Sequence, residues 1–195
     1  MKAVDFLVVG LGNPGDEYHS TRHNFGFLAV DRLARGLGIS LRHLPLLQAE
    51  AGVGELSPSS LVLAKPITYM NASGQAVAAL TRFFQLKEPG QLIVIHDDLD
   101  IPLGKIKIKS GGGAGGHKGV NSIINSLGTG EFKRVRLGIG LEKRPEDVVD
   151  YVLTPFPGEE QVLVHQVLTE AEAATRMIIL QGPEKAMNHF HRQSG

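Results

Sequence analysis

The sequence of 195 residues has no cysteine and no tryptophan, and its formal net charge at pH 7 is zero. The absence of cysteine excludes disulfides, a thiol nucleophile and thiolate metal ligands. No apolar run approaches the roughly 18 residues of a membrane span, and residues 1–5 do not resemble a signal peptide. We therefore expect a cytoplasmic protein that does not associate with membranes.

The zero net charge conceals an uneven distribution. Residues 105–144 contain nine Lys and Arg but two acidic residues, a local balance of +7, whereas residues 145–175 contain seven acidic residues and no Lys or Arg. This distribution indicates a one-sided positive surface of the kind that binds a polyanion. Composition alone favours the simpler alternative, a solvated strand edge.

The chain length fits a single domain, residues 1–195, with a substantial core. Short apolar runs typical of strands alternate with segments of helical periodicity. Strands are expected at residues 7–10, 61–64, 92–95, 105–109 and 135–139, and helices at residues 27–37, 75–84, 120–127, 158–181 and 183–191. The order predicts one three-layer α/β domain, and alternating isoleucine and lysine near residue 107 favour a mixed sheet. His189 and His191 are interpreted as frayed surface side chains.

Residues 7–27 have the order strand, loop, helix, and open α/β sheets bind their ligands where such strands end. A Gly-x-Gly-x-x-Gly pattern at residues 10–15 matches the dinucleotide-binding fingerprint literally. Pro14 and several polar residues, however, intervene before a helix can begin, so the pattern does not have the context of that fingerprint. The glycines fit a tight turn that presents Asn13.

His23 lies at the mouth of the first helix and is a candidate general base. A neutral imidazole activates water near pH 7 when an acceptor orients its other nitrogen. Asp97, at the end of another strand, is the natural acceptor, with Asp98 and Asp100 as alternatives. A metal cluster at residues 96–100 is less favoured, because adjacent strand residues point to opposite faces, and we expect no metal site.

Asn13 and Asn71 each follow an expected strand. Either asparagine alone is explained as a turn residue. Together at one edge of a sheet, their amides can bind a peptide-like group or a developing oxyanion. Tyr69 and Met70 next to Asn71 provide an apolar wall, or else belong to the core.

The glycine run at residues 111–116 is too dense for a simple connection. Such a run lets backbone amides approach an anion and can also move as a lid, while a disordered hinge is the alternative. His117 and Lys118 follow at the start of the next helix, which suits a phosphate or the end of a nucleic acid.

Four segments together point to a family. Residues 10–27 read GLGNPGDEYHSTRHNFGF, residues 66–77 read PITYMNASGQAV, residues 96–119 read HDDLDIPLGKIKIKSGGGAGGHKG and residues 132–140 read FKRVRLGIG. With these segments in this order, the chain resembles a bacterial-type peptidyl-tRNA hydrolase over nearly its whole length.

The resemblance implies a monomeric three-layer α/β/α sandwich around a single mixed sheet. It implies hydrolysis of the ester that joins a peptide to the 3′ end of tRNA, without a cofactor. The catalytic set that it implies is His23, its carboxylate partner Asp97, and the positioning asparagines Asn13 and Asn71. We expect the substrate-binding set to be Tyr18, Tyr69, Met70, Asn71, His117 and Lys118, and the set that binds the acceptor stem and 3′ end of tRNA to be Lys107, Lys109, Lys118 and Arg136.

Lys118 departs from the family pattern, which usually has Asn after this histidine. A lysine only donates hydrogen bonds and carries charge, so we expect Lys118 to contact a phosphate near the tRNA 3′ end. Two other functions are considered. One is a non-enzymatic RNA-binding protein on the same fold, and the other is a nucleotide- or metal-dependent enzyme that uses the glycine loops.

Overall fold

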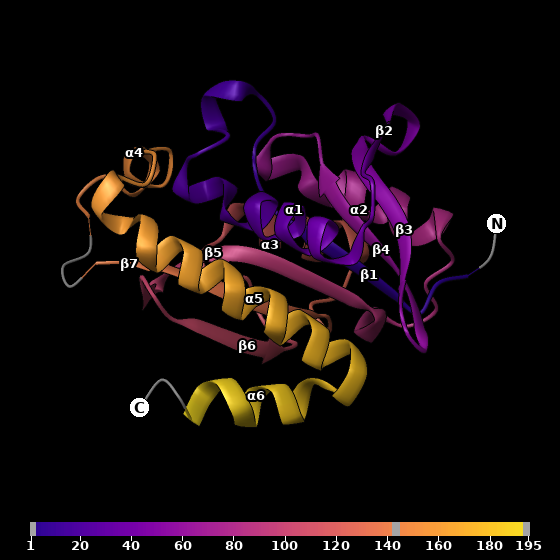
Figure 1. Ribbon diagram of the computed structural model, residues 1–195. Helices are drawn as coiled ribbons and strands as arrows, with labels where there is room; N and C mark the ends of the chain where they lie inside the picture. Colours follow the sequence, from indigo (N-terminus) through magenta and orange to yellow (C-terminus); the bar gives the residue numbers. More distant parts are fainter. Residues whose placement is uncertain (1–2, 142–144, 193–195) are drawn as a thin grey trace.

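A seven-stranded mixed sheet forms the centre of the computed structural model, which describes residues 3–141 and 145–192 (Figure 1). The strand order is β2-β3-β4-β1-β5-β7-β6. The strands are β1 (Phe6–Gly10), β2 (Arg42–Leu44), β3 (Ala49–Leu56), β4 (Ser59–Pro66), β5 (Leu92–Pro102), β6 (Ile106–Ser110) and β7 (Lys133–Gly140). The pairs β1–β4, β1–β5 and β5–β7 are parallel, whereas β2–β3, β3–β4 and β6–β7 are antiparallel. The mixed sheet expected from the sequence is confirmed.

Helices cover both faces of the sheet. They are α1 (Phe25–Leu37), α2 (Ser73–Phe83), α3 (Lys118–Leu127), α4 (Val148–Val152), α5 (Gln161–Gln181) and α6 (Pro183–Arg192). Helices α1, α5 and α6 pack on one face, and α2 and α3 pack on the other (Figure 1). The α/β/α sandwich is therefore confirmed. The strands β2 and β3 and the helix α4 were not expected, and the helix expected at 158–181 begins as a 3₁₀ turn, Gly158–Glu160.

The central strands are buried on both faces, which explains their continuous apolar runs. In β1, Val8 contacts the core below α1 and α5, while Leu7 and Val9 contact the core below α2 and α3. All three side chains are fully buried. These two cores fix the register of β1, so the segment after Gly10 always leaves the sheet at the same point.

Helix α1 lies unusually close to the carboxyl ends of the strands. A Cβ atom on Gly26 would collide with the backbone of Leu11 and Ile95, so only glycine allows this approach. Because the 3₁₀ turn Arg22–Asn24 directly precedes α1, the close approach brings His23 to Asp97 in the middle of β5.

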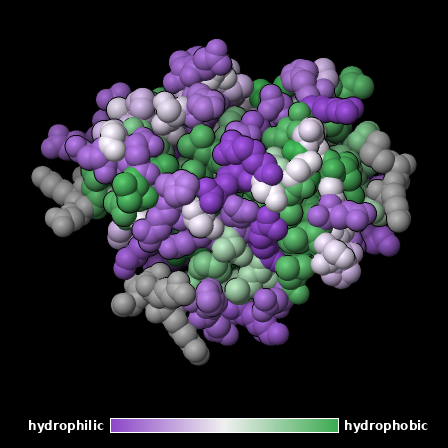
Figure 2. All heavy atoms as spheres, viewed as in Figure 1, coloured by the Kyte–Doolittle hydropathy of each residue, from purple (hydrophilic) through white to green (hydrophobic). Residues whose placement is uncertain are grey.

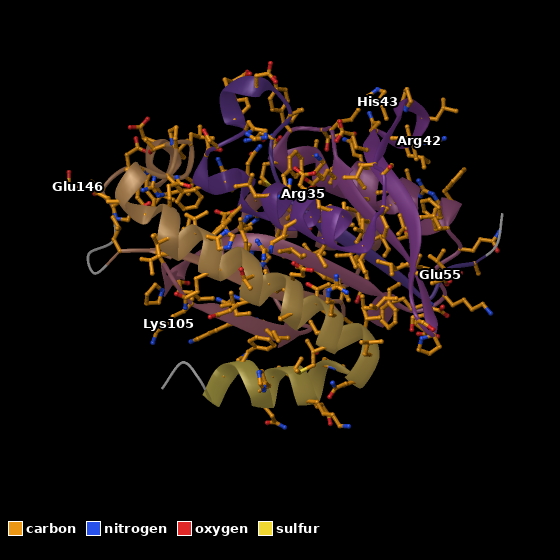
Figure 3. All side chains as sticks on the ribbon, viewed as in Figure 1. Arg35, Arg42, His43, Glu55, Lys105 and Glu146 are labelled. Atoms are coloured by element: carbon orange, nitrogen blue, oxygen red, sulfur yellow. The ribbon has the colours of Figure 1, made fainter. Side chains whose placement is uncertain are left out.

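Basic side chains lie at both edges of the sheet. Arg42 and His43 lie on the edge strand β2, while Lys105 lies beside β6 at the opposite edge (Figure 3). Across the face viewed in Figure 1, hydrophilic side chains alternate with hydrophobic patches (Figure 2). None of the helices in the described ranges has both the length and the apolar character of a membrane span.

The C-terminal helix corrects one expectation. His191 is not merely a frayed surface side chain, because its Nε2 accepts a hydrogen bond from the backbone N–H of Ile108 at 3.0 Å. This bond satisfies a donor on the edge strand β6. Met1, Lys2 and three residues of the charge count, Glu142, Lys143 and Arg144, lie outside the described residues.

Candidate active site

A cleft of about 290 Å³ opens beyond the carboxyl end of β1, beside residues 97–100 of the longer strand β5. Its lining combines polar groups from several elements with an apolar wall. The polar members are Asn13, His23, Asn71, Asp97, Asp98, Asp100, His117 and Lys118, and the apolar wall includes Met70, Leu99, Val148, Val149, Val152 and Leu153. The structure thus brings together side chains from six separate segments of the chain, around residues 13, 23, 69–71, 97–100, 115–118 and 148–153.

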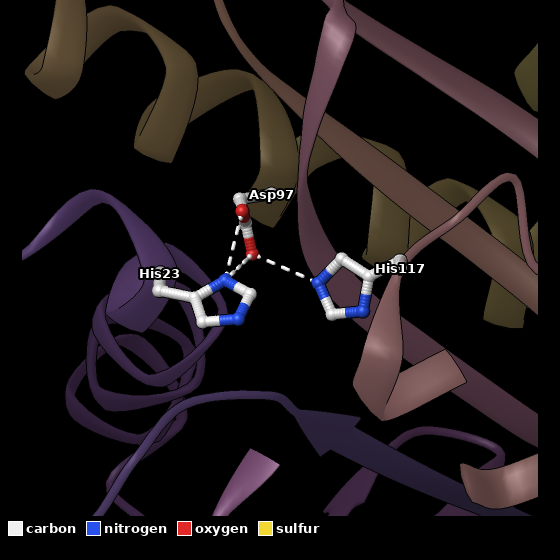
Figure 4. Close-up of side chains that lie close together, drawn as sticks. All are labelled: His23, Asp97 and His117. Carbon is white, nitrogen blue, oxygen red and sulfur yellow. Dashed lines mark hydrogen bonds and ion pairs between the residues drawn. The ribbon is translucent and has the colours of Figure 1, made fainter. Parts of the chain in front are cut away.

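His23 and Asp97 form the central contact of the cleft (Figure 4). Nδ1 of His23 lies 3.0 Å from both carboxylate oxygens of Asp97, whose side chain is 3% exposed. Since a carboxylate only accepts hydrogen bonds, Nδ1 carries the proton and Nε2 holds the lone pair. No described residue bonds to this Nε2, which leaves a base for a water in the cleft.

The two alternative carboxylates do not contact His23. Asp98 points to the other face of β5, where its Oδ2 accepts from Nε of Arg136 at 2.7 Å. Its Oδ1 accepts from the backbone N–H of Asp100, whose own side chain is exposed. The alternation of side chains along a strand therefore selects Asp97.

His23 and Asp97 shift each other's pKa. Burial disfavours the charged imidazole, but the charge and hydrogen bond of Asp97 outweigh it and raise the pKa of His23 above its ordinary value. Lys118 opposes this rise. Burial likewise disfavours the carboxylate of Asp97, yet His23 and His117 hold its pKa well below the usual range. Asp97 is therefore ionised at neutral pH.

His117 is a second histidine on the same carboxylate. Its Nε2 lies 3.0 Å from Oδ1 of Asp97, and its ring centroid lies 5.2 Å from that of His23 (Figure 4). Ligand atoms of these three residues lie within 4.8 Å of one another, and among the residues that the structure describes they are the set that could hold a metal ion. However, Nδ1 of His117 accepts two backbone hydrogen bonds, so Nε2 carries the proton and has no lone pair for a metal. The donor set fits hydrogen bonding better than metal binding.

Asn13 is fixed by its neighbours. Its Oδ1 accepts from the backbone N–H of Met70 at 2.8 Å, and its backbone exchanges two hydrogen bonds with the side chain of Asn24. The amide orientation follows: Oδ1 points to the protein, and the Nδ2 donor is left to the cleft. Asn71 lies opposite in the turn before α2, where it is exposed and lines the same cleft.

Arg22 links His23 to the segment after α4, a role that sequence reasoning missed. Its guanidinium donates to the carbonyls of Thr154 and Pro155 and pairs with Glu160 at 2.8 Å. It also lies 4.5 Å from the ring centre of Tyr151. Its partners are 129 to 138 residues away in the sequence, so no local pattern reveals these contacts.

Helix α4 supplies the apolar side of the cleft. Asp147 caps its N-terminus, because the Asp147 side chain accepts from the backbone N–H of Asp150. Tyr69 and Met70 line the cleft from the α2 side, as expected, with Met70 also in the core. Tyr18 lies outside the lining, so the structure does not bring it to the cleft.

The glycine run is anchored at its start. Arg134, which is buried, donates to the carbonyls of Gly112, Gly113 and Gly130. Gly115, at the other end of the run, lines the cleft. Arg134 thus belongs to the interior, although the charge count assigned it to the basic surface.

The basic residues of β6 and β7 lie beside the cleft. Lys107 pairs in register with Arg136, and both lie on the sheet face opposite the buried side chains of Ile106 and Ile108. Lys107 is exposed and Lys109 half-buried. Neither lysine forms an ion pair within the described part of the chain, so their charge remains available to a polyanion.

Comparisons with known proteins show to which family the chain belongs. The family model described as peptidyl-tRNA hydrolase matches residues 7–195. The chain belongs to the peptidyl-tRNA hydrolase family. Peptidyl-tRNA hydrolase of Aquifex aeolicus is 46% identical, with 96% of each chain covered, and that of Mycobacterium tuberculosis is 45% identical, with 97% of this chain and 98% of the relative covered. The crystal structure of peptidyl-tRNA hydrolase from Acinetobacter baumannii superposes with a TM-score of 0.89 at 37% identity, covering 97% and 96% of the two chains.

Within this peptidyl-tRNA hydrolase family member, Lys118 is the first residue of α3 and is exposed at the cleft. Its ammonium is near enough to oppose protonation of His23. The departure from the family pattern therefore places a positive charge beside the candidate base, rather than at a remote surface.

Proposed function

We propose that the protein hydrolyses the ester bond between a peptide, or an N-blocked amino acid, and the 3′ end of tRNA. The observation that carries this proposal is the orientation of His23, whose Nδ1–H is held by Asp97 and whose Nε2 is left to the cleft. Membership of the peptidyl-tRNA hydrolase family supports it. The proposed form is a single domain, residues 1–195, that acts as a monomer in the cytoplasm.

In the proposed reaction, water is the nucleophile. Nε2 of His23 takes a proton from the water as its oxygen attacks the ester carbonyl. Collapse of the tetrahedral intermediate breaks the bond to the ribose 3′ oxygen, which takes the proton back from the imidazolium. The products are a peptide with a free carboxylate and a tRNA with a free 3′ hydroxyl. An ester is activated relative to an amide, so the reaction needs no serine or cysteine nucleophile and no cofactor.

The two asparagines serve different parts of the substrate. The Nδ2 donor of Asn13 is fixed beside His23 and stabilises the oxyanion of the intermediate. Asn71 recognises the peptide bond next to the ester. A neutral amide pairs well with a peptide group and poorly with the free α-ammonium of aminoacyl-tRNA, which the enzyme must spare. Tyr69, Met70 and α4 contact the apolar side chains of the peptide.

Binding of tRNA depends on the basic surface beside the cleft. Lys107, Lys109 and Arg136 contact phosphates of the acceptor stem, and Lys118 contacts a phosphate near the 3′ end. These contacts carry no sequence information, which suits an enzyme that must accept many tRNAs. His117 lines the substrate-binding cleft, although both its ring nitrogens already have partners in the protein.

The deciding experiment measures release of N-acetylated amino acid from N-acetyl-aminoacyl-tRNA, with the unblocked aminoacyl-tRNA as matched control. The expected result is rapid release from the blocked ester and little from the free one. A protein that binds tRNA but releases nothing would instead be a non-enzymatic RNA-binding protein, although such a protein has no chemical need for an oriented His23.

A further inference from the structure

His117 lies at a junction between the glycine run, helix α3 and the carboxylate of Asp97. Its side chain is 9% exposed. Nδ1 accepts from the backbone N–H groups of Gly119 and Val120, at 3.2 and 3.3 Å, and thereby caps α3. Nε2 contacts Oδ1 of Asp97 at 3.0 Å. Both nitrogens of the ring are therefore occupied by groups of this chain.

The hydrogen-bond partners of the two ring nitrogens determine the tautomer of His117. Two N–H groups point at Nδ1, so this atom must present its lone pair, and the proton must be on Nε2. A proton on Nδ1 would point at the hydrogens of the two backbone N–H groups. Both hydrogen bonds, and with them the cap of α3, would then be lost. His117 is thus a neutral donor to Asp97 and has no lone pair left with which to accept a proton from water.

A third histidine, His96, stabilises this arrangement. The ring of His96 packs edge-on against that of His117, with centroids 4.6 Å apart and an interplanar angle of 64°. Its Nδ1 lies 2.7 Å from the backbone carbonyl of Asp97, to which it donates. Burial lowers the pKa of His96 to about 3, so this ring is neutral throughout the physiological range. One neutral imidazole therefore holds the backbone of Asp97 and another holds its carboxylate.

We propose that His117 is a positioning residue for His23: it holds the carboxylate of Asp97 from the side opposite His23, in the one tautomer that the cap of α3 dictates. Its N–H takes up part of the negative charge that Asp97 presents to His23. The base is thereby kept oriented, and the rise that Asp97 causes in its pKa is limited. This role rests on the proposed function, in which His23 accepts a proton from water.

The groups around His23 define what a test must keep constant. Asp97 faces it from β5, His117 and Lys118 face it from the start of α3, and α4 presents apolar side chains. The other ionisable side chains that line the cleft are Tyr69, Asp98 and Asp100. All of them except His117 are unchanged in the variants below.

Two substitutions separate the two ends of the His117 ring. In His117→Asn, the amide oxygen replaces Nδ1 as the cap of α3, and asparagine is among the best capping residues, but the donor to Asp97 is lost. In His117→Gln, the longer amide replaces the Nε2 donor, and the cap is lost. A residue whose only role is to cap α3 would be well replaced by Asn and poorly by Gln. A positioning residue gives the reverse.

The direct measurement is an NMR titration of the His23 imidazole in the full-length protein without substrate, in the wild type and both variants. We expect His117→Asn to raise the pKa of His23, because Asp97 then presents its full charge to one ring. We expect His117→Gln to leave this pKa near that of the wild type but to lower the melting temperature. In the wild type, the ¹⁵N shifts of His117 should show a bare Nδ1. A His117→Asn protein with an unchanged or lowered His23 pKa, or a wild-type His117 protonated at Nδ1, would overturn the proposal.

Kinetics give the second readout. For His117→Asn, kcat on N-acetyl-aminoacyl-tRNA should fall roughly tenfold, because a hydrogen bond to a charged group is lost, and the acid limb of the pH profile should move to higher pH. His117→Gln should retain most of kcat. Loss of activity in the Gln variant but not in the Asn variant contradicts the proposal. Because the NMR titration needs no turnover, it separates failure of this proposal from failure of the proposed reaction.

Discussion

The cleft and the basic surface of β6 and β7 lie on one sheet, but their side chains are held in different ways. In the cleft, Asp97 is 3% exposed and both its oxygens contact histidines. On the basic surface, Lys107 is exposed and lies in register with Arg136, which is itself a cation. Chemistry at one atom needs a fixed geometry, whereas binding to a phosphate backbone needs only charge of one sign within reach. The difference predicts two classes of variant: those that stop turnover, and those that weaken binding in proportion to salt.

The largest effect on kcat is expected at Asp97, the most constrained side chain of the cleft. Asp97→Asn keeps the size of the side chain but removes its charge, so kcat should fall on the order of a thousandfold. In the wild type, kcat/KM should rise with pH with a midpoint above 6.5, because the pKa of His23 is raised and only the neutral imidazole accepts a proton. In Asp97→Asn, loss of that charge should move the midpoint to lower pH. A midpoint that stays in place would show that Asp97 does not set the basicity of His23.

The second largest effect is expected at Arg22, which links His23 to the segment after α4. Arg22→Met leaves Glu160 without its partner and two carbonyls without a donor, and we expect the free energy of unfolding to fall by about 3 kcal/mol. Arg176→Met is a matched control, because its pair with Glu172 is more exposed and should be worth about 0.5 kcal/mol or less. Urea denaturation measures both. Equal losses in the two variants would mean that Arg22 is not a special link between His23 and α4.

On the basic surface, removal of charge should act on binding. The double variant Lys107→Gln, Lys109→Gln should raise KM for the tRNA substrate several-fold, with a much smaller change in kcat. It should also flatten the dependence of log KM on log salt by about one unit for each lysine. Arg42→Gln, on the edge strand β2 far from the cleft, is the control and should change neither (Figure 3). If kcat falls by a larger factor than KM rises, these lysines act in the chemical step instead.

The smallest effect is expected at Lys118, which belongs to both regions. Lys118→Asn should flatten the salt dependence of KM by about one unit, and it should raise the pKa of His23 because an opposing charge is lost. Kinetics at several salt concentrations, combined with the NMR titration of His23, measure both. An unchanged salt dependence would mean that Lys118 does not contact a phosphate.

The sequence predicts the parts of the fold that have a strong local signal. The buried runs of β1 and β4 and the amphipathic α1 and α3 lie within a few residues of their expected positions, whereas β5 continues to Pro102, well beyond the run expected at 92–95. The strand β3 was missed because it contains Gly52 and Gly54, which have low β propensity. Their lack of side chains is needed, since a Cβ at either position would collide with Ile39 or Ser40.

The sequence predicts those residues of the candidate site whose position follows from a single strand or turn. Asp97 was expected to orient His23, with Asp98 and Asp100 as alternatives, and the contact of Asp97 with His23 decides among the three. The bond of Asp98 to Arg136 was not expected. The contacts of Arg22 and the second bond to Asp97 from His117 join residues far apart in sequence, and no periodicity encodes them. Composition also misjudged Arg134, whose charge holds the glycine run instead of facing solvent.

The most direct test of the central claim compares the wild type with His23→Ala on N-acetyl-aminoacyl-tRNA, with tRNA binding measured in parallel. If His23 is the general base, the variant should lose several orders of magnitude in kcat while its affinity for tRNA stays close to that of the wild type, because the basic surface is intact. If the variant retains most of its activity, water is activated by another group and the assignment of His23 is wrong.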